Sequence, residues 1–143
     1  MKKILLLSLI GLAGVGVGGG AAFATDKLLG PSVPTAAAVA ETMFVPAGKI
    51  LAPLVFKDGR LSGYVSFEVQ LEVAAEDSER IVIRLPVLLN AINMRTYRTP
   101  IASGPDGMLP NIAVFKKVVM EAAVEAFGRG TVRSAAVTGA VPA

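Results

Sequence analysis

The sequence predicts an α+β fold in which a hydrophobic N-terminal helix precedes a small antiparallel sheet with two helices packed on one face. Three observations predict it. A ten-residue stretch alternates apolar and polar side chains, two later stretches space their apolar residues as helices do, and the first two dozen residues carry almost no charge. In chain order, the elements expected in the folded domain are strand, strand, helix, helix and strand.

The composition excludes several classes of site. The chain of 143 residues contains no cysteine and no histidine. Without cysteine there is no disulfide framework and no thiol nucleophile. Without either residue, a zinc site of the usual kind and a histidine-centred catalytic triad are excluded as well. We therefore expect a non-enzymatic protein without a catalytic, cofactor-binding or metal site.

The basic excess of the chain belongs to its first residues. The formal net charge is +3, but Lys2 and Lys3 precede the hydrophobic stretch. Setting these two aside leaves 12 of the 14 basic residues against 11 acidic residues, a balance of +1. A near-neutral domain lacks the basic patch of a nucleic-acid-binding protein, so no nucleic-acid partner is expected.

Residues 4–24 form a hydrophobic stretch of 21 residues without charge. A helix of about 20 apolar residues can cross a bilayer, with Lys2 and Lys3 remaining on the cytoplasmic side. The alternative is a signal peptide, because Ala22-Phe23-Ala24 has the small-x-small form of a cleavage site before Thr25. Cleavage would release a secreted or periplasmic binding protein, and in both cases the remainder of the chain is exported.

Residues 25–43 are expected to link this stretch (1–24) to a folded domain of residues 44–143. The segment contains Gly30, Pro31, Pro34 and an alanine run, and it lacks a continuous apolar stripe. Such a linker would hold the domain away from the membrane. The alternative for its second half is a short helix from Thr35 to Met43.

Two strands joined by a tight turn are expected at the start of the domain. Residues 49–56 are apolar apart from Lys49, and Pro53 indicates an edge strand. The pair Asp58-Gly59 is typical of a two-residue type I′ turn. Strict alternation over residues 64–73 predicts a strand with one buried and one exposed face. The buried face comprises Val65, Phe67, Val69, Leu71 and Val73, and the exposed face comprises Tyr64, Ser66, Glu68, Gln70 and Glu72.

The first helix is expected between the acidic segment 76–79 and Tyr97. Negative charge stabilises a helix N-terminus, and five apolar residues share one side of this helix. Because Pro86 lies within the span, either the helix is kinked or residues 81–85 are extended and the helix begins at Pro86. The five apolar residues are Ile81, Leu85, Leu88, Leu89 and Ile92.

A loop, a second helix and a closing strand complete the domain. The loop includes residues 99–107, whose glycines lack the pattern of a phosphate-binding motif. Asn111 is expected to cap the second helix and Gly128 to end it. Residues 131–137 then form the closing strand. The helix would bury Ile112, Phe115, Val119, Ala122 and Ala126 and expose Lys117, Glu121 and Glu125.

The polar face of the strand 64–73 is the first candidate site. Glu68 and Glu72 lie on this face with Gln70 between them, at about 7 Å for each step of two residues. Paired carboxylates can act as acid and base, but no nucleophile accompanies them, so a solvated sheet face is the simpler interpretation. A third interpretation is that this face, together with Tyr64, contacts a neighbouring subunit or partner.

The second candidate site is the end of the first helix, where Arg95 and Arg98 flank Tyr97. Arginine and tyrosine are common in interface hot spots, so Tyr97 is a candidate partner contact. The alternative is that the basic side chains interact with the dipole of their own helix.

Three segments together resemble the FliL family of flagellar basal-body-associated proteins. LAPLVFKDGRLSGYVSFEVQLEV (residues 51–73) resembles the paired strands that open the family domain. RLPVLLNAIN (84–93) is similar to its first helix, and FKKVVMEAAVEAFGRGTVRSAAVTGAV (115–141) to its closing helix and strand. The resemblance covers nearly the whole chain and rests on hydrophobic and turn patterns. The closing strand departs from the family pattern in its alanine content.

The resemblance implies a single-pass inner-membrane protein with an uncleaved anchor and a periplasmic C-terminal domain similar to stomatin-type scaffolds. It also implies self-association into a ring around the ion-driven stator units and a role in flagellar rotation, motility and chemotaxis. The partners would be the lipid bilayer, further copies of the chain and flagellar stator or basal-body proteins. No cofactor is implied.

Overall fold

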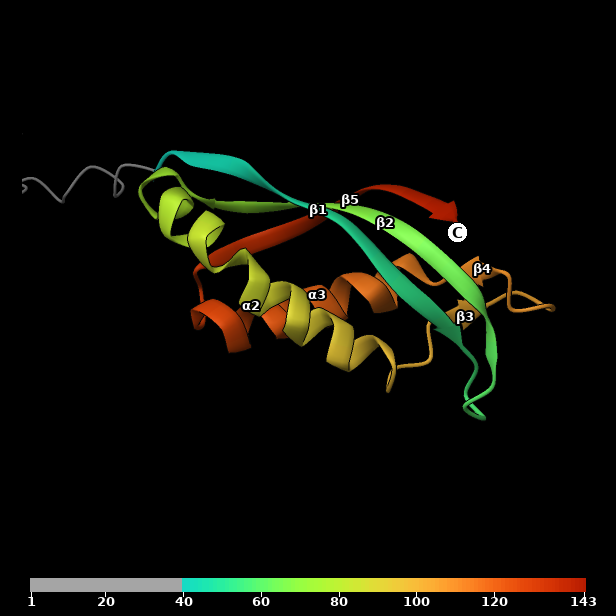
Figure 1. Cartoon of the computed structure of the whole chain (residues 1–143). Coiled ribbons are helices and arrows are strands. Elements are labelled where there is room, and N and C mark those ends of the chain that lie inside the picture. Colours follow the sequence, from blue (N-terminus) through green and yellow to red (C-terminus); the bar gives the residue numbers. More distant parts are fainter. Residues whose placement is uncertain (1–39) are drawn as a thin grey trace, which may run out of the picture. The chain divides into compact units, whose positions relative to one another are not determined.

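A computed structural model of the chain describes residues 40–143 (Figure 1). The α+β class, with a small antiparallel sheet and two helices, is confirmed. The hydrophobic stretch 4–24, its cleavage site and most of the expected linker lie outside the described residues. The elements are β1 (Thr42–Val55), β2 (Leu61–Ala74), the short 3-10 helix η1 (Ala75–Asp77), α2 (Ser78–Thr96), β3 (Ala102–Ser103), β4 (Leu109–Pro110), α3 (Ile112–Phe127) and β5 (Val132–Pro142).

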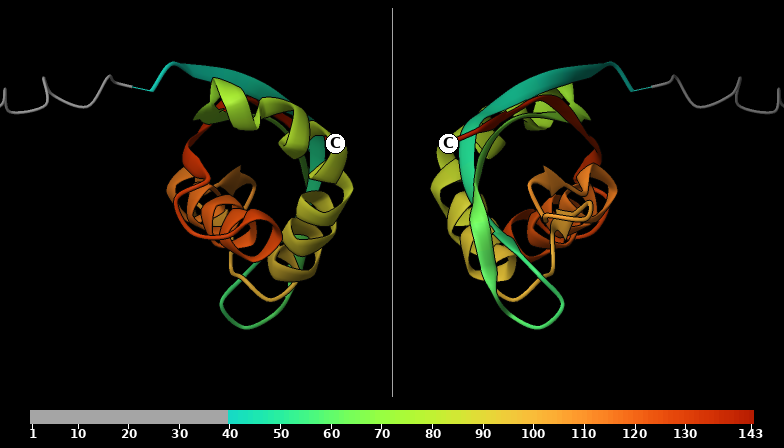
Figure 2. Two further views of the ribbon diagram at one scale, coloured as in Figure 1. Left: turned by 90° about the vertical axis from the view of Figure 1, so that its left-hand side faces the viewer. Right: turned by 90° about the vertical axis from the view of Figure 1, so that its right-hand side faces the viewer.

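The main sheet has three antiparallel strands in the order β1-β2-β5, so β2 is central. Pro53 therefore lies on an edge strand, as predicted, where a missing N–H is tolerated. β1 and β5 both pair antiparallel with β2 and hence run in the same direction. Views from two sides show both helices on one side of this sheet, so its other face carries no helix (Figure 2).

The alternation along β2 separates core from surface as predicted. All five apolar residues of its predicted buried face are at most 2% exposed. Phe67 from this face stacks on Phe115 of α3, with ring centroids 3.7 Å apart and an interplanar angle of 12°. Because each buried aromatic ring removes a large apolar area from water, this contact holds the sheet against the helical layer.

The turn between β1 and β2 differs from the predicted type I′ turn. A type I′ turn needs a positive φ at both central residues, but only Gly59 has one, at 85°, and Asp58 does not. The Gly59 N–H donates to the Phe56 carbonyl (3.0 Å), and the Phe56 N–H donates to the Arg60 carbonyl (2.9 Å). This is a three-residue loop closed by a glycine bulge. The Arg60 side chain and backbone N–H also donate to Asp58, which lowers the pKa of that carboxyl.

α2 continues through Pro86 as an α-helix, so the alternative of an extended segment at residues 81–85 is wrong. Three residues of the predicted apolar stripe are fully buried, and the other two are partly buried against the same core. The fully buried residues are Ile81, Leu88 and Ile92, and the partly buried ones are Leu85 and Leu89. The helix begins in the predicted acidic segment, where negative charge complements the helix dipole.

α3 begins and ends as predicted. The Asn111 side chain accepts a hydrogen bond from the Val114 N–H (3.1 Å), and Gly128 follows the last turn with a φ of 94°. Four of the five predicted stripe residues are buried: Phe115, Val119, Ala122 and Ala126. The predicted burial of Ile112 is wrong, because this residue lies in the first turn, where no earlier turn helps to cover it, and is 40% exposed.

The loop between α2 and α3 contains a short two-stranded ladder that the sequence does not predict. β3 and β4 pair through two residues each. Gly107 of this loop has a φ of 70° and lies so close to Phe56 that a Cβ atom there would be 2.1 Å from the ring. Ser62 Oγ of β2 also donates to the Asp106 carbonyl (3.3 Å). These contacts fasten the loop to the hairpin formed by β1 and β2.

The first and last strands are longer than expected. β1 begins at Thr42, whereas the sequence predicts the strand only from residue 49 and the folded domain from residue 44. Because Thr42 and Met43 are extended, the alternative helix does not reach Met43. β5 continues beyond Val137 to Pro142, since β2 provides pairing partners as far as Val65. In the part of the chain that the structure describes, no helix has both the length and the apolar character needed to cross a bilayer.

Candidate functional site

The face of the main sheet that carries no helix holds the residues predicted from the strand pattern. Tyr64, Glu68, Gln70 and Glu72 all lie along this face of β2, and Tyr64 is 37% exposed. We call these four residues and their neighbours on β1 and β5 the outer sheet face. Tyr97 is not part of it, because it caps α2 on the helical side of the domain, where it is 57% exposed. The predicted partner residues therefore lie on two separate surfaces.

Each carboxylate of the outer sheet face has a partner on a different strand. Glu68 forms an ion pair with Lys49 of β1 (3.7 Å), and Glu72 accepts a hydrogen bond from Ser134 Oγ of β5 (2.7 Å). The two glutamates are four residues apart, which corresponds to about 13 Å along β2 at the rise of a strand. Carboxylates that act together on a glycosidic bond lie roughly 5–10 Å apart. The arrangement suits cross-strand contacts better than shared acid–base work.

A shallow cavity of about 270 Å³ opens on the outer sheet face where the strands bulge. The register of β1 shifts between Pro46 and Gly48, and the pairing of β2 with β5 shifts between Glu68 and Val69. Small-molecule sites usually enclose about 300–1,000 Å³ and bury most of their ligand. This cavity has the dimensions to receive one side chain of a protein partner. Its lining includes Pro46, Gly48, Lys49, Glu68, Gln70 and Thr138.

Two exposed apolar residues of β1 extend the outer sheet face. Phe44 pairs with Glu72 and Leu51 pairs with Ser66, so both project to the same side as these partners. Phe44 is 52% exposed and Leu51 is 56% exposed. Apolar side chains surrounded by polar ones are typical of protein–protein interfaces. The sequence pattern does not mark these two residues, because the bulge at Gly48 interrupts the alternation along β1.

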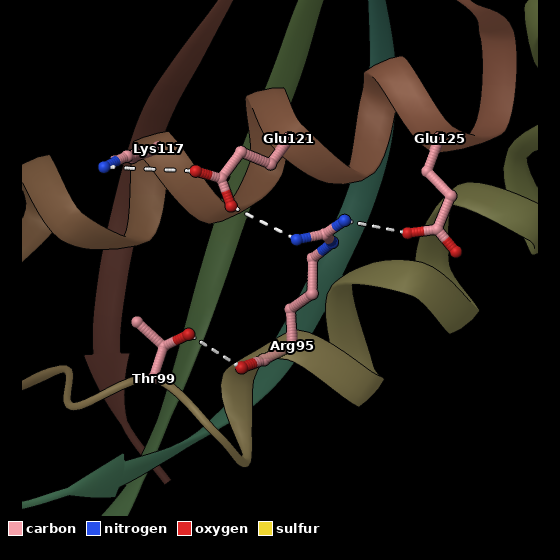
Figure 3. A network of polar contacts seen from close by, with 5 residues as sticks. All are labelled: Arg95, Thr99, Lys117, Glu121 and Glu125. Atoms are coloured by element: carbon pink, nitrogen blue, oxygen red, sulfur yellow. Dashed lines mark hydrogen bonds and ion pairs between the residues drawn. The ribbon is translucent and has the colours of Figure 1, made fainter.

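Arg95 connects the two helices (Figure 3). Its guanidinium donates to Glu121 (3.2 Å) and Glu125 (3.0 Å) of α3, and Lys117 Nζ lies 4.0 Å from Glu121. Thr99 Oγ1 donates to the Arg95 carbonyl (2.9 Å), which satisfies an acceptor at the end of α2. The sequence predicts basic residues at this helix end, but the contact with α3 depends on how the two helices cross.

The end of α2 also borders a cavity of about 440 Å³. Its lining includes Asn90, Met94, Arg95, Arg98 and Thr99. Arg98 forms no ion pair within residues 40–143. Within the same range, no three acidic side chains are grouped so that they could hold a metal ion.

Two surfaces therefore carry the functional interpretation: the outer sheet face and the C-terminal end of α2. Comparison with known proteins found no match to the chain among family models, curated proteins or solved structures.

Proposed function

We propose that the chain is a non-enzymatic, membrane-anchored periplasmic protein of the bacterial flagellar basal body that supports or regulates the stator and thereby motility. The observation that carries the proposal is the outer sheet face, an exposed and partly apolar surface on a small domain that follows a hydrophobic segment. Such a surface is suited to protein contacts.

The arrangement of the elements supports this proposal. The order of two strands, two helices and a closing strand, with a three-stranded sheet, agrees with the architecture that the FliL resemblance implies. An anchor formed by residues 4–24 would confine the domain beside its membrane partners and raise their effective concentration. The outer sheet face would then contact a stator or basal-body protein, or a neighbouring copy in a ring.

Intact-mass analysis and membrane fractionation of the native protein test whether residues 4–24 remain in the chain as an anchor. An intact chain in the membrane fraction supports the proposal. A soluble chain that begins at Thr25 would instead favour a released binding protein, the alternative for which Ala22-Phe23-Ala24 is the motivating observation. Replacing Lys2 and Lys3 by glutamate should reduce the fraction of chains inserted with the domain in the periplasm, because it removes the positive charge that orients the segment.

Motility under load tests the flagellar role. Deleting the gene is expected to reduce swimming and swarming, and most strongly in viscous medium, where the stator must deliver more torque. Expression of the intact chain should restore both. Unchanged motility of the deletion strain under load would contradict the motor role, whether or not the chain is anchored.

The substitution Leu51→Glu tests the outer sheet face itself. Leu51 is 56% exposed, so the domain should still fold, whereas a charge among apolar contacts should prevent partner binding and reproduce the deletion phenotype. Leu109→Glu is the matched control, because Leu109 on β4 is 61% exposed and lies outside this face. Equal effects of the two substitutions would argue against a role for the outer sheet face.

A further inference from the structure

α2 is apolar on two opposite sides. One side packs into the core through Ile81, Leu88 and Ile92. The other side faces solvent and exposes three large apolar residues: Ile83 at 75%, Val87 at 47% and Met94 at 52%. Tyr97, the residue that caps the helix, continues this side and is 57% exposed. A helix that is apolar on both sides is normally buried on both sides.

The outward residues of α2 form a continuous line. Positions 83, 87, 90, 94 and 97 are spaced by four, three, four and three residues, which is the average repeat of 3.5 residues that keeps one face of a helix against a partner helix. They extend over about 21 Å at the rise of an α-helix. We call Ile83, Val87, Asn90, Met94 and Tyr97 the α2 seam.

The other helix shows that an apolar outer side is not a general property of this domain. The exposed surface of α3 carries its charged residues, as expected for a helix that faces water, and only two large exposed apolar ones, Ile112 at 40% and Val124 at 42%. Between Arg84 and Arg95, by contrast, the exposed residues of α2 include no charge. The charged residues of α3 are Lys116, Lys117, Glu121 and Glu125.

We propose that the α2 seam pairs with the α2 seam of a second copy of the chain, with the two helices parallel and related by a two-fold axis. When two parallel helices are related by a two-fold axis that runs along them, each seam residue meets its own counterpart, so a seam of this kind complements itself. Asn90 is the central position. Its side-chain amide has both donors and an acceptor, so two Asn90 side chains can satisfy each other across the axis.

The charges beside the α2 seam favour the parallel direction. In parallel helix pairs, residues that flank the seam and are five apart in sequence lie opposite each other, which brings Glu79 next to Arg84 of the second copy. An antiparallel pair would instead bring Arg84 to the same edge as Arg98 of the second copy, a like-charge contact. Glu79, Arg84 and Arg98 form no ion pair within residues 40–143, so all three are available.

The position of the N-terminal strand gives a second reason for the parallel direction. A cavity of about 500 Å³ is lined both by residues 43–46 of β1 and by Ala75, Glu76, Ser78, Glu79 and Val82, so the start of β1 lies beside the start of α2. Parallel helices therefore place Ala40 of both copies at the same end of the pair. This arrangement suits two chains anchored in one membrane, and this step alone rests on the proposed function.

Disulfide trapping tests the pairing. The chain has no cysteine, so single cysteines can be placed without removing others. Full-length Ile83→Cys and full-length Tyr97→Cys are each expected to form disulfide-linked dimers on mild oxidation, since a disulfide needs Cα atoms within about 7 Å. Lys117→Cys on α3 and Leu109→Cys on β4 are exposed controls and should not exceed random collision. If disulfides form only when Ile83→Cys and Tyr97→Cys chains are mixed, the helices pair antiparallel and the proposal is overturned. Linkage no stronger than in the controls would overturn it as well.

Charge substitutions separate pairing from folding. Val87→Glu and Met94→Glu should each lower the linked fraction of Ile83→Cys by about tenfold or more, because each places like charges opposite one another. The midpoint of unfolding, measured at protein concentrations low enough to keep the chain unpaired, should stay unchanged. Glu79→Arg should weaken linkage, and adding Arg84→Glu should restore it. Failure of that restoration would overturn the parallel register.

The same strains distinguish this proposal from the proposed function. Absent Ile83→Cys linkage in a chain that stays in the membrane and supports motility would overturn the helix pairing alone. Efficient linkage in a strain whose motility does not depend on the chain would support the pairing and overturn the flagellar role.

Discussion

The central strand β2 packs against α3 through the stacked rings of Phe67 and Phe115. Both side chains are fully buried, and their centroids lie 3.7 Å apart. Protein interiors are close-packed, so removal of one ring leaves a cavity that the neighbouring side chains refill only in part.

Phe115→Ala is therefore expected to lower the free energy of unfolding by about 3–5 kcal/mol. Phe44→Ala is the control, because Phe44 is 52% exposed, and it should cost less than about 1 kcal/mol. Urea denaturation measures both, with unchanged m-values showing that the native state is otherwise preserved. Similar losses for the two substitutions would contradict the central role of the stacked pair.

Arg95 holds α2 and α3 together by contacting two carboxylates at once. Arg95→Ala is expected to lower the free energy of unfolding by about 1 kcal/mol, a modest value because the pairs are partly exposed. Arg95→Lys should recover only part of the loss, since an ammonium group lacks the planar fork that contacts Glu121 and Glu125 together. Arg98→Ala, which removes no ion pair, is the control. A loss that does not shrink at high salt would show that packing rather than charge is responsible.

At the scale of elements, the β1–β2 hairpin packs against the loop 103–108. This contact joins two segments that are far apart in sequence. Gly107 allows this contact, because its positive φ and missing side chain leave room for Phe56. Gly107→Ala is expected to lower the free energy of unfolding by roughly 1–3 kcal/mol through steric overlap and backbone strain.

A double substitution separates those two causes. Phe56→Ala combined with Gly107→Ala should cost less than the sum of the single changes, because the overlap disappears when the ring is removed. Gly59→Ala is the matched control, since it has a φ of 85° but no atom within 4 Å of a Cβ atom. Additive effects in denaturation experiments would show that only backbone strain matters at Gly107.

The elements with strong local signals could be predicted from the sequence. Strict alternation fixed β2 and its two faces, and Asn111 and Gly128 marked the ends of α3 correctly. The two-residue strands β3 and β4 could not be predicted, because so short a segment has no measurable periodicity. The length of β5 was underestimated since its alanine and glycine residues have low strand propensity, and pairing with β2 overrides that preference.

At the scale of the whole molecule, all three strands of the main sheet and both helices contribute to one core within residues 40–143. The fragment 40–143 is therefore expected to fold without the preceding segment. Its thermal unfolding should be a single cooperative transition, followed by circular dichroism, with calorimetric and van't Hoff enthalpies in agreement. A broad or multistep transition would contradict a single cooperative core in residues 40–143.

The candidate surfaces were predictable only where they follow from one element. The four polar residues of β2 share a face because alternate residues of any strand do. Phe44 and Leu51 join them only through the register with β1, and Arg95 meets Glu121 and Glu125 only through the crossing of two helices. Contacts between different elements produce no periodic pattern of residues, so they could not be predicted from the sequence.

The common direction of β1 and β5 has a mechanical consequence. The start of β1 and the end of β5 leave the sheet at opposite ends, since Thr42 pairs with Ala74 and Pro142 pairs with Val65. Tension between these points acts along the strands and at right angles to their hydrogen bonds, so many bonds must break together. Force spectroscopy should find a higher rupture force for tethers at residues 40 and 143 than for tethers at Thr42 and Ala74, which would open the ladder one pair at a time.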